Sequence, residues 1–193
     1  MAVSLVKGQR ISLKKEGGDG LRHIVMGLGW DAKKRGGFFG FGGTQQEIDL
    51  DATCVFFDHE NNYVNVVYYG QLQSPDGSIK HTGDNRTGAG EGDDEQIIVD
   101  LTSVPATVKT LMFVVNSYAG HTFSEIENSF CRVVDQSTGK EIARYDLTCN
   151  GPHTALVMAK IYRHQGEWKM HAIGESAHGK TFADLGPDMA AHL

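Results

Sequence analysis

The chain contains few cysteines and no apolar run long enough to cross a membrane. Three of its 193 residues are cysteines, an odd number without CxxC spacing, at positions Cys54, Cys131 and Cys149. This pattern indicates neither a disulfide framework nor a zinc site, so we interpret the cysteines as small buried apolar side chains. A membrane span needs about 20 consecutive apolar residues, and residues 1–10 lack the apolar core of a signal peptide. The sequence therefore predicts a cytoplasmic protein without a membrane span.

Basic residues are scarce relative to acidic ones. The chain has 18 Lys and Arg against 24 Asp and Glu, which gives a formal net charge of −6. Binding to nucleic acid depends on clustered Lys and Arg that displace counterions from phosphates. The composition argues against a nucleic-acid partner and suits a cationic one better.

Catalytic signatures are missing as well. The sequence has no Walker loop, no HExxH motif and no Ser-His-Asp pattern, and its nine histidines form no HxH or HxxxH pair. The segment Gly174–His178 fails as a nucleophile elbow because His178 stands where the second Gly belongs. We therefore expect that the protein is not an enzyme.

Short segments rich in β-branched and aromatic residues recur along the chain between clusters of Gly, Asn and Asp, as is typical of strands. We expect strands at Ile11–Lys14, His23–Leu28, Ala52–Phe57, Val64–Tyr69, Gln96–Leu101, Leu111–Asn116, Phe130–Asp135, Glu141–Leu147, Thr154–Arg163 and Trp168–Ile173. No helix is long enough for crossovers between parallel strands. The sequence therefore predicts an all-β fold, an antiparallel two-sheet β-sandwich with a few short helices.

Turn and helix signals complete this prediction. Gly residues in Asp135–Gly139 and His164–Glu167 favour two hairpins between sequential strands. Short helical turns are expected at Ser103–Val108, at Phe123–Asn128 and in part of Thr181–His192, where Gly186-Pro187 would interrupt a longer helix. The length fits a single domain over residues 1–193, with a weakly structured or partly helical tail from about 175 to 193.

One Asp- and Gly-rich loop, Ser74–Glu95, concentrates the acidic residues Asp76, Asp84, Glu91, Asp93, Asp94 and Glu95. Carboxylates in contact repel by up to about 4 kcal/mol per pair at an effective dielectric near 20, so a compact loop would need a cation. Calcium takes about six to eight oxygen ligands, whereas zinc and copper favour His or Cys. An extended, solvated loop would need no metal, and the residues alone leave both interpretations open.

The loop does not form an EF-hand. Asp84 and Glu95 occupy the first and twelfth positions of such a window, but Arg86 and Gly88 stand at ligand positions and Ala89 replaces the required Gly. A calcium site here would have to be built differently.

Three further acids are expected near the same loop. Asp49 and Asp51 stand where a strand begins, and alternation sends both side chains to one face. Asp31 closes another strand and would reach the same end of the sandwich if the strands alternate up and down. The residues alone therefore leave two interpretations open, a calcium-binding loop at one end of the sandwich and a solvated loop with ordinary strand ends.

Several motifs resemble the recurring signature of the TerD family of bacterial tellurite-resistance and stress proteins. They are Gly27–Asp31, Asp49–Ala52, His81–Gly88, Gly92–Glu95, Glu141–Leu147, Tyr162–His164 and Gly166–Lys169. The resemblance runs in order from about Val3 to about Gly174, and the length and a Gly- and Phe-rich insert are most similar to the TerZ branch. It implies a two-sheet sandwich with calcium at one end and a place in a tellurite-resistance operon linked to phage inhibition, colicin resistance and stress response. It implies no known catalytic reaction.

The same resemblance implies a set of metal ligands, with two calcium ions expected. The side-chain ligands would be Asp31, Asp49, Asp51, Asp84, Asn85, Asp93, Asp94 and Glu95. Carbonyl ligands would come from Gly83, Arg86, Gly90 and Gly92. Which residues serve which ion stays open.

These expectations define a function and one alternative. The protein is expected to be a non-catalytic binding or scaffold module whose loop is ordered by calcium, with other Ter-operon proteins and a membrane-associated complex as partners. Phe38, Phe39 and Phe41 would contact a partner or membrane if exposed, and would otherwise cover the sandwich. The alternative is a calcium-dependent carbohydrate- or other ligand-binding sandwich in which Trp30 or Trp168 stacks on a sugar, although a cytoplasmic location counts against it.

Overall fold

The computed structural model describes residues 2–33, 48–85, 92–147 and 151–193. Its strands are β1 (Val3–Leu5), β2 (Arg10–Ser12), β3 (His23–Ala32), β4 (Asp51–Asp58), β5 (Tyr63–Val67), β6 (Ile79–His81), β7 (Glu95–Asp100), β8 (Val108–Asn116), β9 (Ile126–Asp135), β10 (Glu141–Asp146), β11 (Ala155–His164) and β12 (Glu167–Ala177). Its helices are α1 (Leu13–Gly17), α2 (Gly186–Ala190) and the 3₁₀ helices η1 (Phe123–Glu125) and η2 (Phe182–Leu185). Strands dominate and every helix is short, which confirms the predicted fold class.

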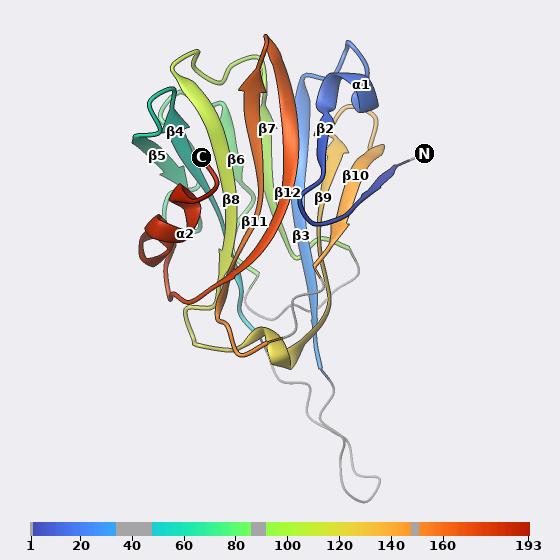
Figure 1. The fold of residues 1–193 in the computed structure, drawn as a ribbon. Coiled ribbons are helices and arrows are strands. Elements are labelled where there is room, and N and C mark those ends of the chain that lie inside the picture. The colour runs from blue at the N-terminus through green and yellow to red at the C-terminus, as the bar shows by residue number, and fades with distance from the viewer. Residues whose placement is uncertain (1, 34–47, 86–91, 148–150) are drawn as a thin grey trace, which may run out of the picture.

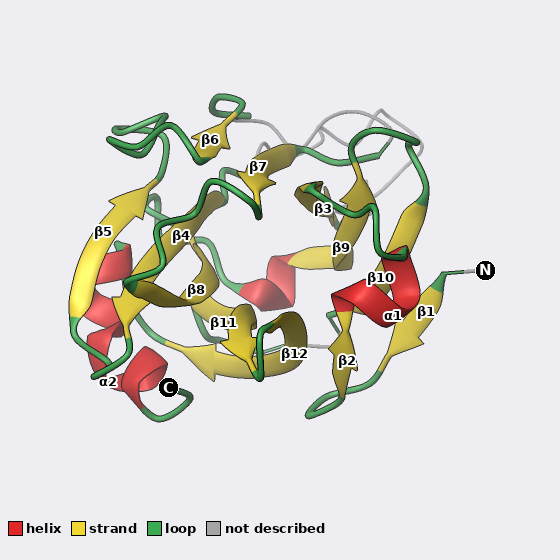
Figure 2. Ribbon diagram, turned by 90° about the horizontal axis from the view of Figure 1, so that it is seen from above, coloured by secondary structure: helices red, strands yellow, loops and turns green. Residues whose placement is uncertain are grey.

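Two six-stranded sheets lie face to face, with strand orders β1-β10-β9-β3-β7-β6 and β2-β12-β11-β8-β4-β5. Figure 2 shows the two sheets curving around a shared interior. Inward side chains of both sheets form the main core, which includes Phe56 and Phe113, each at most 1 % exposed. Every strand pairing but one is antiparallel; β1 pairs with β10 in parallel at the sheet edge. The predicted hairpins at Asp135–Gly139 and His164–Glu167 are both present.

The helical predictions needed correction at several places. Ser103–Val108 forms no helix, because Asp100 accepts hydrogen bonds from the backbone N–H groups of Thr102 and Ser103 and holds a turn instead. The helical turn expected at Phe123–Asn128 ends at Glu125, where β9 follows. The strand expected at Ile11–Lys14 ends at Ser12, whose hydroxyl caps α1 by accepting from the Lys15 N–H at 3.2 Å.

The C-terminal segment covers the outer face of the second sheet. Figure 1 shows α2 beside β4, β5 and β8. Leu185 and Met189 are buried against a second apolar cluster formed by outward side chains of that sheet. The sequence predicts that Gly186-Pro187 interrupts a helix. Instead, α2 begins at these two residues, because Pro in the first turn of a helix costs no hydrogen bond.

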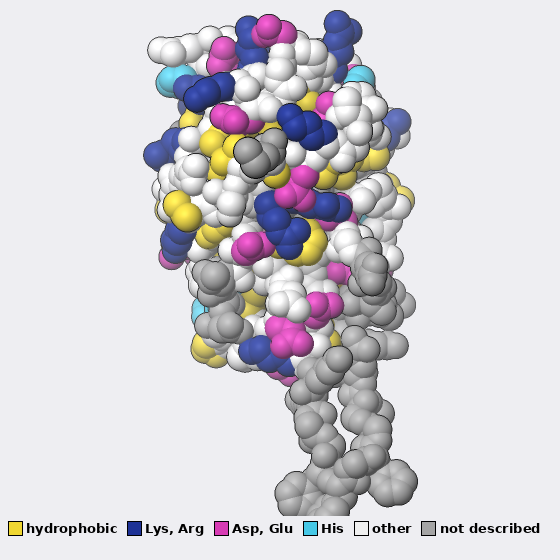
Figure 3. Space-filling view, turned by 90° about the vertical axis from the view of Figure 1, so that its right-hand side faces the viewer, with side chains coloured by type: hydrophobic (Ala, Val, Ile, Leu, Met, Phe, Trp, Pro, Cys, Tyr) yellow, Lys and Arg dark blue, Asp and Glu magenta, His cyan; other side chains and the backbone are white. Residues whose placement is uncertain are grey.

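The edge of the sandwich near β1 and β10 carries charges of both signs. Figure 3 shows Lys and Arg interspersed with Asp and Glu on this side. The pairs include Arg132 with Glu141 at 3.2 Å and Arg144 with Asp146 at 2.8 Å. No single-sign patch therefore dominates the described residues of this face.

The helices of the described residues are all too short and too polar to cross a membrane. Cys54 and Cys131 are buried and free, as expected, whereas Cys149 lies outside the described residues. Phe38, Phe39 and Phe41 also lie outside them.

Candidate metal centre

Strand direction brings distant acidic residues to one end of the sandwich. β4 and β7 begin at this end, while β3, β6 and β8 finish there, because the strands alternate in direction. Leu28 of β3 pairs with Glu95 at the start of β7, and Asp51 at the start of β4 pairs with Asn116 at the end of β8. The convergence predicted from sequence therefore has a topological cause.

Asp49, Asp51 and Asp84 form the closest group of carboxylates in the described residues. One oxygen from each lies within 4.8 Å of the others. Asp51 is buried at 5 % exposure, Asp49 is half-buried, and Asp84 is exposed. This arrangement could hold one metal ion, with the exposed side open to further ligands.

The electrostatics of Asp51 indicate a site short of positive charge. Burial is the main cause that raises the pKa of Asp51 to about 7. The charges of Asp49, Glu95 and Asp84 raise it further, in that order, while the backbone N–H of Tyr118 lowers it. A divalent cation would offset both the burial and the repulsion.

Glu95 links the two sheets beneath this group. Its side chain is fully buried, Oε2 accepts from the Ala52 N–H at 2.6 Å, and Oε1 accepts from the Asn85 N–H at 3.2 Å. The Nδ1 atom of His81 accepts from the Gly83 N–H, which places the donor N–H of the ring on Nε2. Nε2 lies 3.4 Å from Glu95 Oε2 but forms no hydrogen bond with it. Glu95 therefore fixes the backbone of the acidic group rather than pointing freely toward it.

Asp94 and Asn85 form a second polar group beside β3. Asp94 Oδ2 accepts from the Trp30 N–H at 2.9 Å, and Asp94 Oδ1 accepts from Asn85 Nδ2 at 3.0 Å. Burial and, after it, the charge of Asp31 raise the pKa of Asp94. Asp31 itself accepts from Asn128 Nδ2 at 2.9 Å. Asp31 and Asp94 are thus neighbours, and a second ion between them stays a prediction.

Asp93 faces away from this group. Its Oδ1 accepts from Arg132 Nε at 2.7 Å and its Oδ2 accepts from Gln96 Nε2 at 3.1 Å. The carboxylate packs over Gly27, where a Cβ would lie 2.3 Å from it, so a larger residue at that position would displace Asp93. In this structure the charge of Asp93 is paired with Arg132. The role of Asp93 as a metal ligand stays a prediction.

The predicted carbonyl ligands divide between described and undescribed residues. Gly83 and Gly92 both adopt positive φ, 123° and 103°, which glycine tolerates best. Arg86 and Gly90 lie outside the described residues.

Trp30 is too buried to stack on a sugar, which corrects this part of the expectation behind the carbohydrate alternative. Trp30 is 3 % exposed and donates its Nε1–H to the carbonyl of Ile48 at 2.9 Å. Trp168 donates to the carbonyl of Leu101, and the guanidinium of Arg163 lies 4.2 Å from the centre of its ring. Trp168 is half-buried and lines a surface pocket beside Leu101, so stacking of this ring on a sugar stays a prediction.

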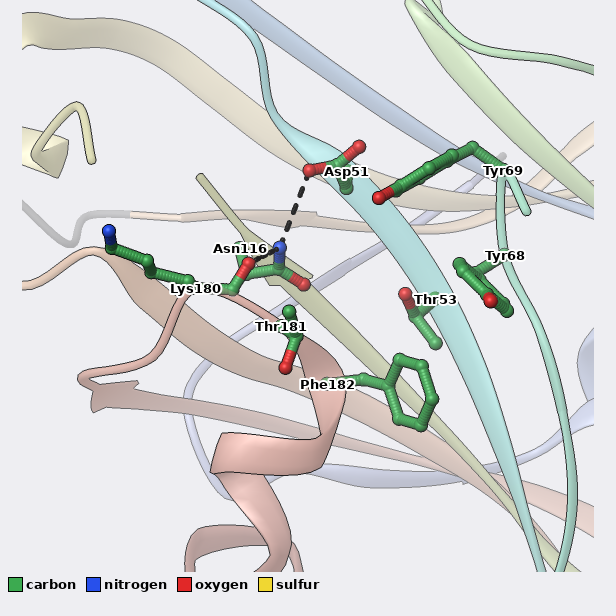
Figure 4. A pocket seen from close by; sticks show the side chains of 8 residues that line it. All are labelled: Asp51, Thr53, Tyr68, Tyr69, Asn116, Lys180, Thr181 and Phe182. Atoms are coloured by element: carbon green, nitrogen blue, oxygen red, sulfur yellow. Dashed lines mark hydrogen bonds between the residues drawn. The ribbon is translucent and has the colours of Figure 1, made fainter. Parts of the chain in front are cut away.

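A pocket of about 240 Å³ opens next to Asp51 (Figure 4). Its lining residues are Asp51, Thr53, Tyr68, Tyr69, Asn116, Lys180, Thr181 and Phe182. Asn116 Nδ2 donates to the Lys180 carbonyl at 2.7 Å and lies 3.4 Å from Asp51 Oδ2. Sequence reasoning missed this pocket, because its walls come from β4, β8 and the C-terminal segment, and no local pattern predicts that they meet.

The pKa of Asp51 predicts an unusual pH dependence for the metal-free protein. Unfolded Asp titrates near pH 4, so between about pH 4 and pH 7 the native state binds a proton that the unfolded state releases. The contribution of Asp51 to the free energy of unfolding is therefore largest at low pH. We expect this contribution to fall by roughly 2 to 4 kcal/mol as the pH rises through that range. Asp51→Asn should remove this component. Urea denaturation of both proteins from pH 4.5 to 7.5 measures the difference, and parallel pH profiles would contradict the prediction.

A family model described as the TerD domain matches residues 1–186. The chain is 46 % identical over 191 residues to the tellurium resistance protein TerZ of Serratia marcescens, which covers 98 % of this chain and 97 % of the relative. It is 44 % identical over 195 residues to the stress response protein SCP2 of Bacillus subtilis (strain 168), covering 96 % and 98 %.

A solved structure also resembles this fold. The crystal structure of a homologue of telluride resistance protein (TerD) from Streptomyces coelicolor A3(2) superimposes with a TM-score of 0.68 at 20 % identity, covering 85 % of this chain and 95 % of that one. At this identity the match supports the sandwich fold alone.

Proposed function

The chain belongs to the TerD domain family, whose members include tellurium-resistance and stress-response proteins, and from this premise we propose that it is a calcium-binding, non-catalytic scaffold module of such a system. Calcium would hold Asp84 against the start of β4 and so fix a surface that other Ter proteins recognise. A cytoplasmic location and a membrane-associated complex are parts of the same proposal.

The observation that carries the proposal is the meeting of Asp49, Asp51 and Asp84, whose oxygens lie within 4.8 Å of one another. Three carboxylates at this spacing repel strongly in a partly buried setting unless protons or a cation compensate them. Their exposed side leaves room for water or backbone oxygens, which calcium accepts in its flexible shell of about six to eight ligands.

The donor set favours calcium over softer metals. The group contains only carboxylate oxygens, and the nearby His81 already faces Glu95 and the Gly83 N–H. Cys54 and Cys131 are both completely buried in the main core. Zinc and copper prefer His and Cys ligands, so a hard cation fits these residues better.

Calorimetric titration with calcium tests the proposal. We expect Asp84→Asn to weaken calcium binding by about tenfold or more, because calcium affinity follows the charge of the ligand set. Asp84 is exposed, so its substitution should leave the fold intact. Asp93→Asn is the matched comparison and should have the smaller effect, since Asp93 is paired with Arg132.

Recovery of Ter proteins on immobilised wild type in calcium and in EGTA tests the scaffold role. If the wild type recovers Ter proteins equally in calcium and in EGTA, and Asp84→Asn recovers them equally well, the calcium-dependent scaffold role is contradicted. If Asp84→Asn binds calcium with the affinity of the wild type, the assignment of the metal site is contradicted.

A further inference from the structure

Three aromatic rings enclose the pocket next to Asp51. The rings of Tyr68 and Tyr69 meet edge to face with centroids 5.2 Å apart, and the rings of Tyr68 and Phe182 lie 5.3 Å apart. Thr53 lies between this aromatic wall and Asp51 (Figure 4). The volume of about 240 Å³ is below that of typical drug-sized pockets and suits a small ligand.

The pocket combines one carboxylate with an amide oxygen and several hydroxyls. The Asp51 carboxylate and the amide oxygen of Asn116 face its interior (Figure 4). The Asn116 amide nitrogen donates to the Lys180 carbonyl at 2.7 Å and to Asp51 Oδ2 at 3.4 Å, which leaves the other oxygen of Asp51 for a ligand. The side chain of Lys180 extends away from the pocket in the same view. None of the described lining residues therefore offers a cation to an anionic ligand.

The position of Tyr68 depends on its neighbour in the turn. A Cβ at Gly70 would lie 2.7 to 2.8 Å from atoms of the Tyr68 ring, closer than real contacts allow. Gly70 therefore permits the ring to fold back and complete the aromatic wall.

We propose that this pocket binds a small protonated amine, with the ammonium group at Asp51 and Asn116 and the carbon chain along Tyr68 and Phe182, and that calcium at the neighbouring carboxylates weakens this binding. An ammonium offers three N–H donors to the acceptors, and its charge is attracted to aromatic faces. A site for an organic cation needs both hydrogen-bond acceptors and aromatic rings, and this pocket has both. A neutral polyol would gain no charge–charge attraction from Asp51. The calcium dependence rests on the proposed function, but amine binding does not.

Charge decides the direction of the coupling. Asp49, Asp51 and Asp84 carry up to three negative charges near the pocket, and one calcium ion would offset two of them. Because Asp51 lines the pocket and belongs to the carboxylate group, calcium and the amine compete for the same charge.

Calorimetry with 1,4-diaminobutane in EGTA tests the pocket, with 1,4-butanediol as the uncharged control. We expect the diamine to bind and the diol not to bind. With one ammonium of the diamine at Asp51, its second ammonium would reach the aromatic wall. Tyr68→Leu should therefore weaken diamine binding by between about twofold and thirtyfold through loss of this cation–π contact. Tyr63→Leu is the matched control, since Tyr63 is 57 % exposed and lies outside the pocket, and it should bind the diamine as the wild type does.

Saturating calcium should weaken diamine binding severalfold, while Tyr68→Leu should bind calcium as the wild type does. Equal binding of diol and diamine, or equal losses in Tyr68→Leu and Tyr63→Leu, would overturn the amine site. Unchanged diamine affinity in calcium would overturn the coupling. Diamine binding in a protein that binds no calcium would support the pocket and refute the proposed function, so the two failures are distinguishable.

Discussion

Calcium added to the metal-free protein should raise its thermal unfolding midpoint by about 5 to 11 °C. A ligand at about 100 times its dissociation constant that binds only the native state adds about 2.7 kcal/mol to the free energy of unfolding. In a chain of 193 residues, each kcal/mol shifts the midpoint by roughly 2 to 4 °C. The carboxylates of Asp49, Asp51 and Asp84 meet only after β4 and β7 have paired with their neighbours, so the unfolded chain should bind calcium weakly.

Differential scanning calorimetry in EGTA, in millimolar calcium and in millimolar magnesium measures this shift. Magnesium should have less effect, since it demands a stricter octahedral shell and gives up its waters reluctantly. Asp84→Asn should remove about half of the calcium shift or more, since a tenfold weaker site adds only about 1.4 kcal/mol at the same calcium concentration. Its midpoint in EGTA should stay close to that of the wild type. No shift, together with no calcium in the purified protein by elemental analysis, would mean that the acidic group is merely solvated.

Substitution Glu95→Ala should lower the free energy of unfolding of the metal-free protein by about 3 to 5 kcal/mol. It removes the acceptor of the buried Ala52 N–H and of the Asn85 N–H. Each buried polar group left without a partner costs about 1 to 3 kcal/mol, and the deleted side chain leaves a cavity. A loss of this size is a large fraction of the stability of an ordinary domain.

Urea denaturation in EGTA measures this loss without interference from calcium. Glu95→Gln should lose less, because it keeps the volume and one acceptor oxygen. Glu127→Ala is the control, since Glu127 is an exposed strand residue at the same end of the molecule, and it should stay within about 0.5 kcal/mol of the wild type. A Glu95→Ala protein as stable as the control would show that Glu95 does not hold the two sheets together.

Local sequence patterns predicted most strands because the relevant forces act between near neighbours. Alternating or continuous apolar runs, as in β8 and β11, reveal half-buried and fully buried strands directly. The very short strands β1 and β6 were missed, since three residues are too few to establish a period and both depend on pairing with distant partners. The helix α1 was also missed, although Ser12 at its N-cap was a usable signal.

The sequence by itself determined that the chain forms a two-sheet sandwich and that Asp49 and Asp51 share one face of a strand, because strand periodicity is a local property of the sequence. The meeting of Asp84 with these two residues was implied only by the family resemblance. Only the tertiary structure decided that Asp93 pairs with Arg132, that Glu95 is buried as a link between sheets, and that Trp30 is buried in the core. It also decided that β4, β8 and the C-terminal segment enclose a pocket beside Asp51. These outcomes depend on which side chains meet across strands far apart in sequence, and that is fixed by sheet order and packing, which no local pattern specifies.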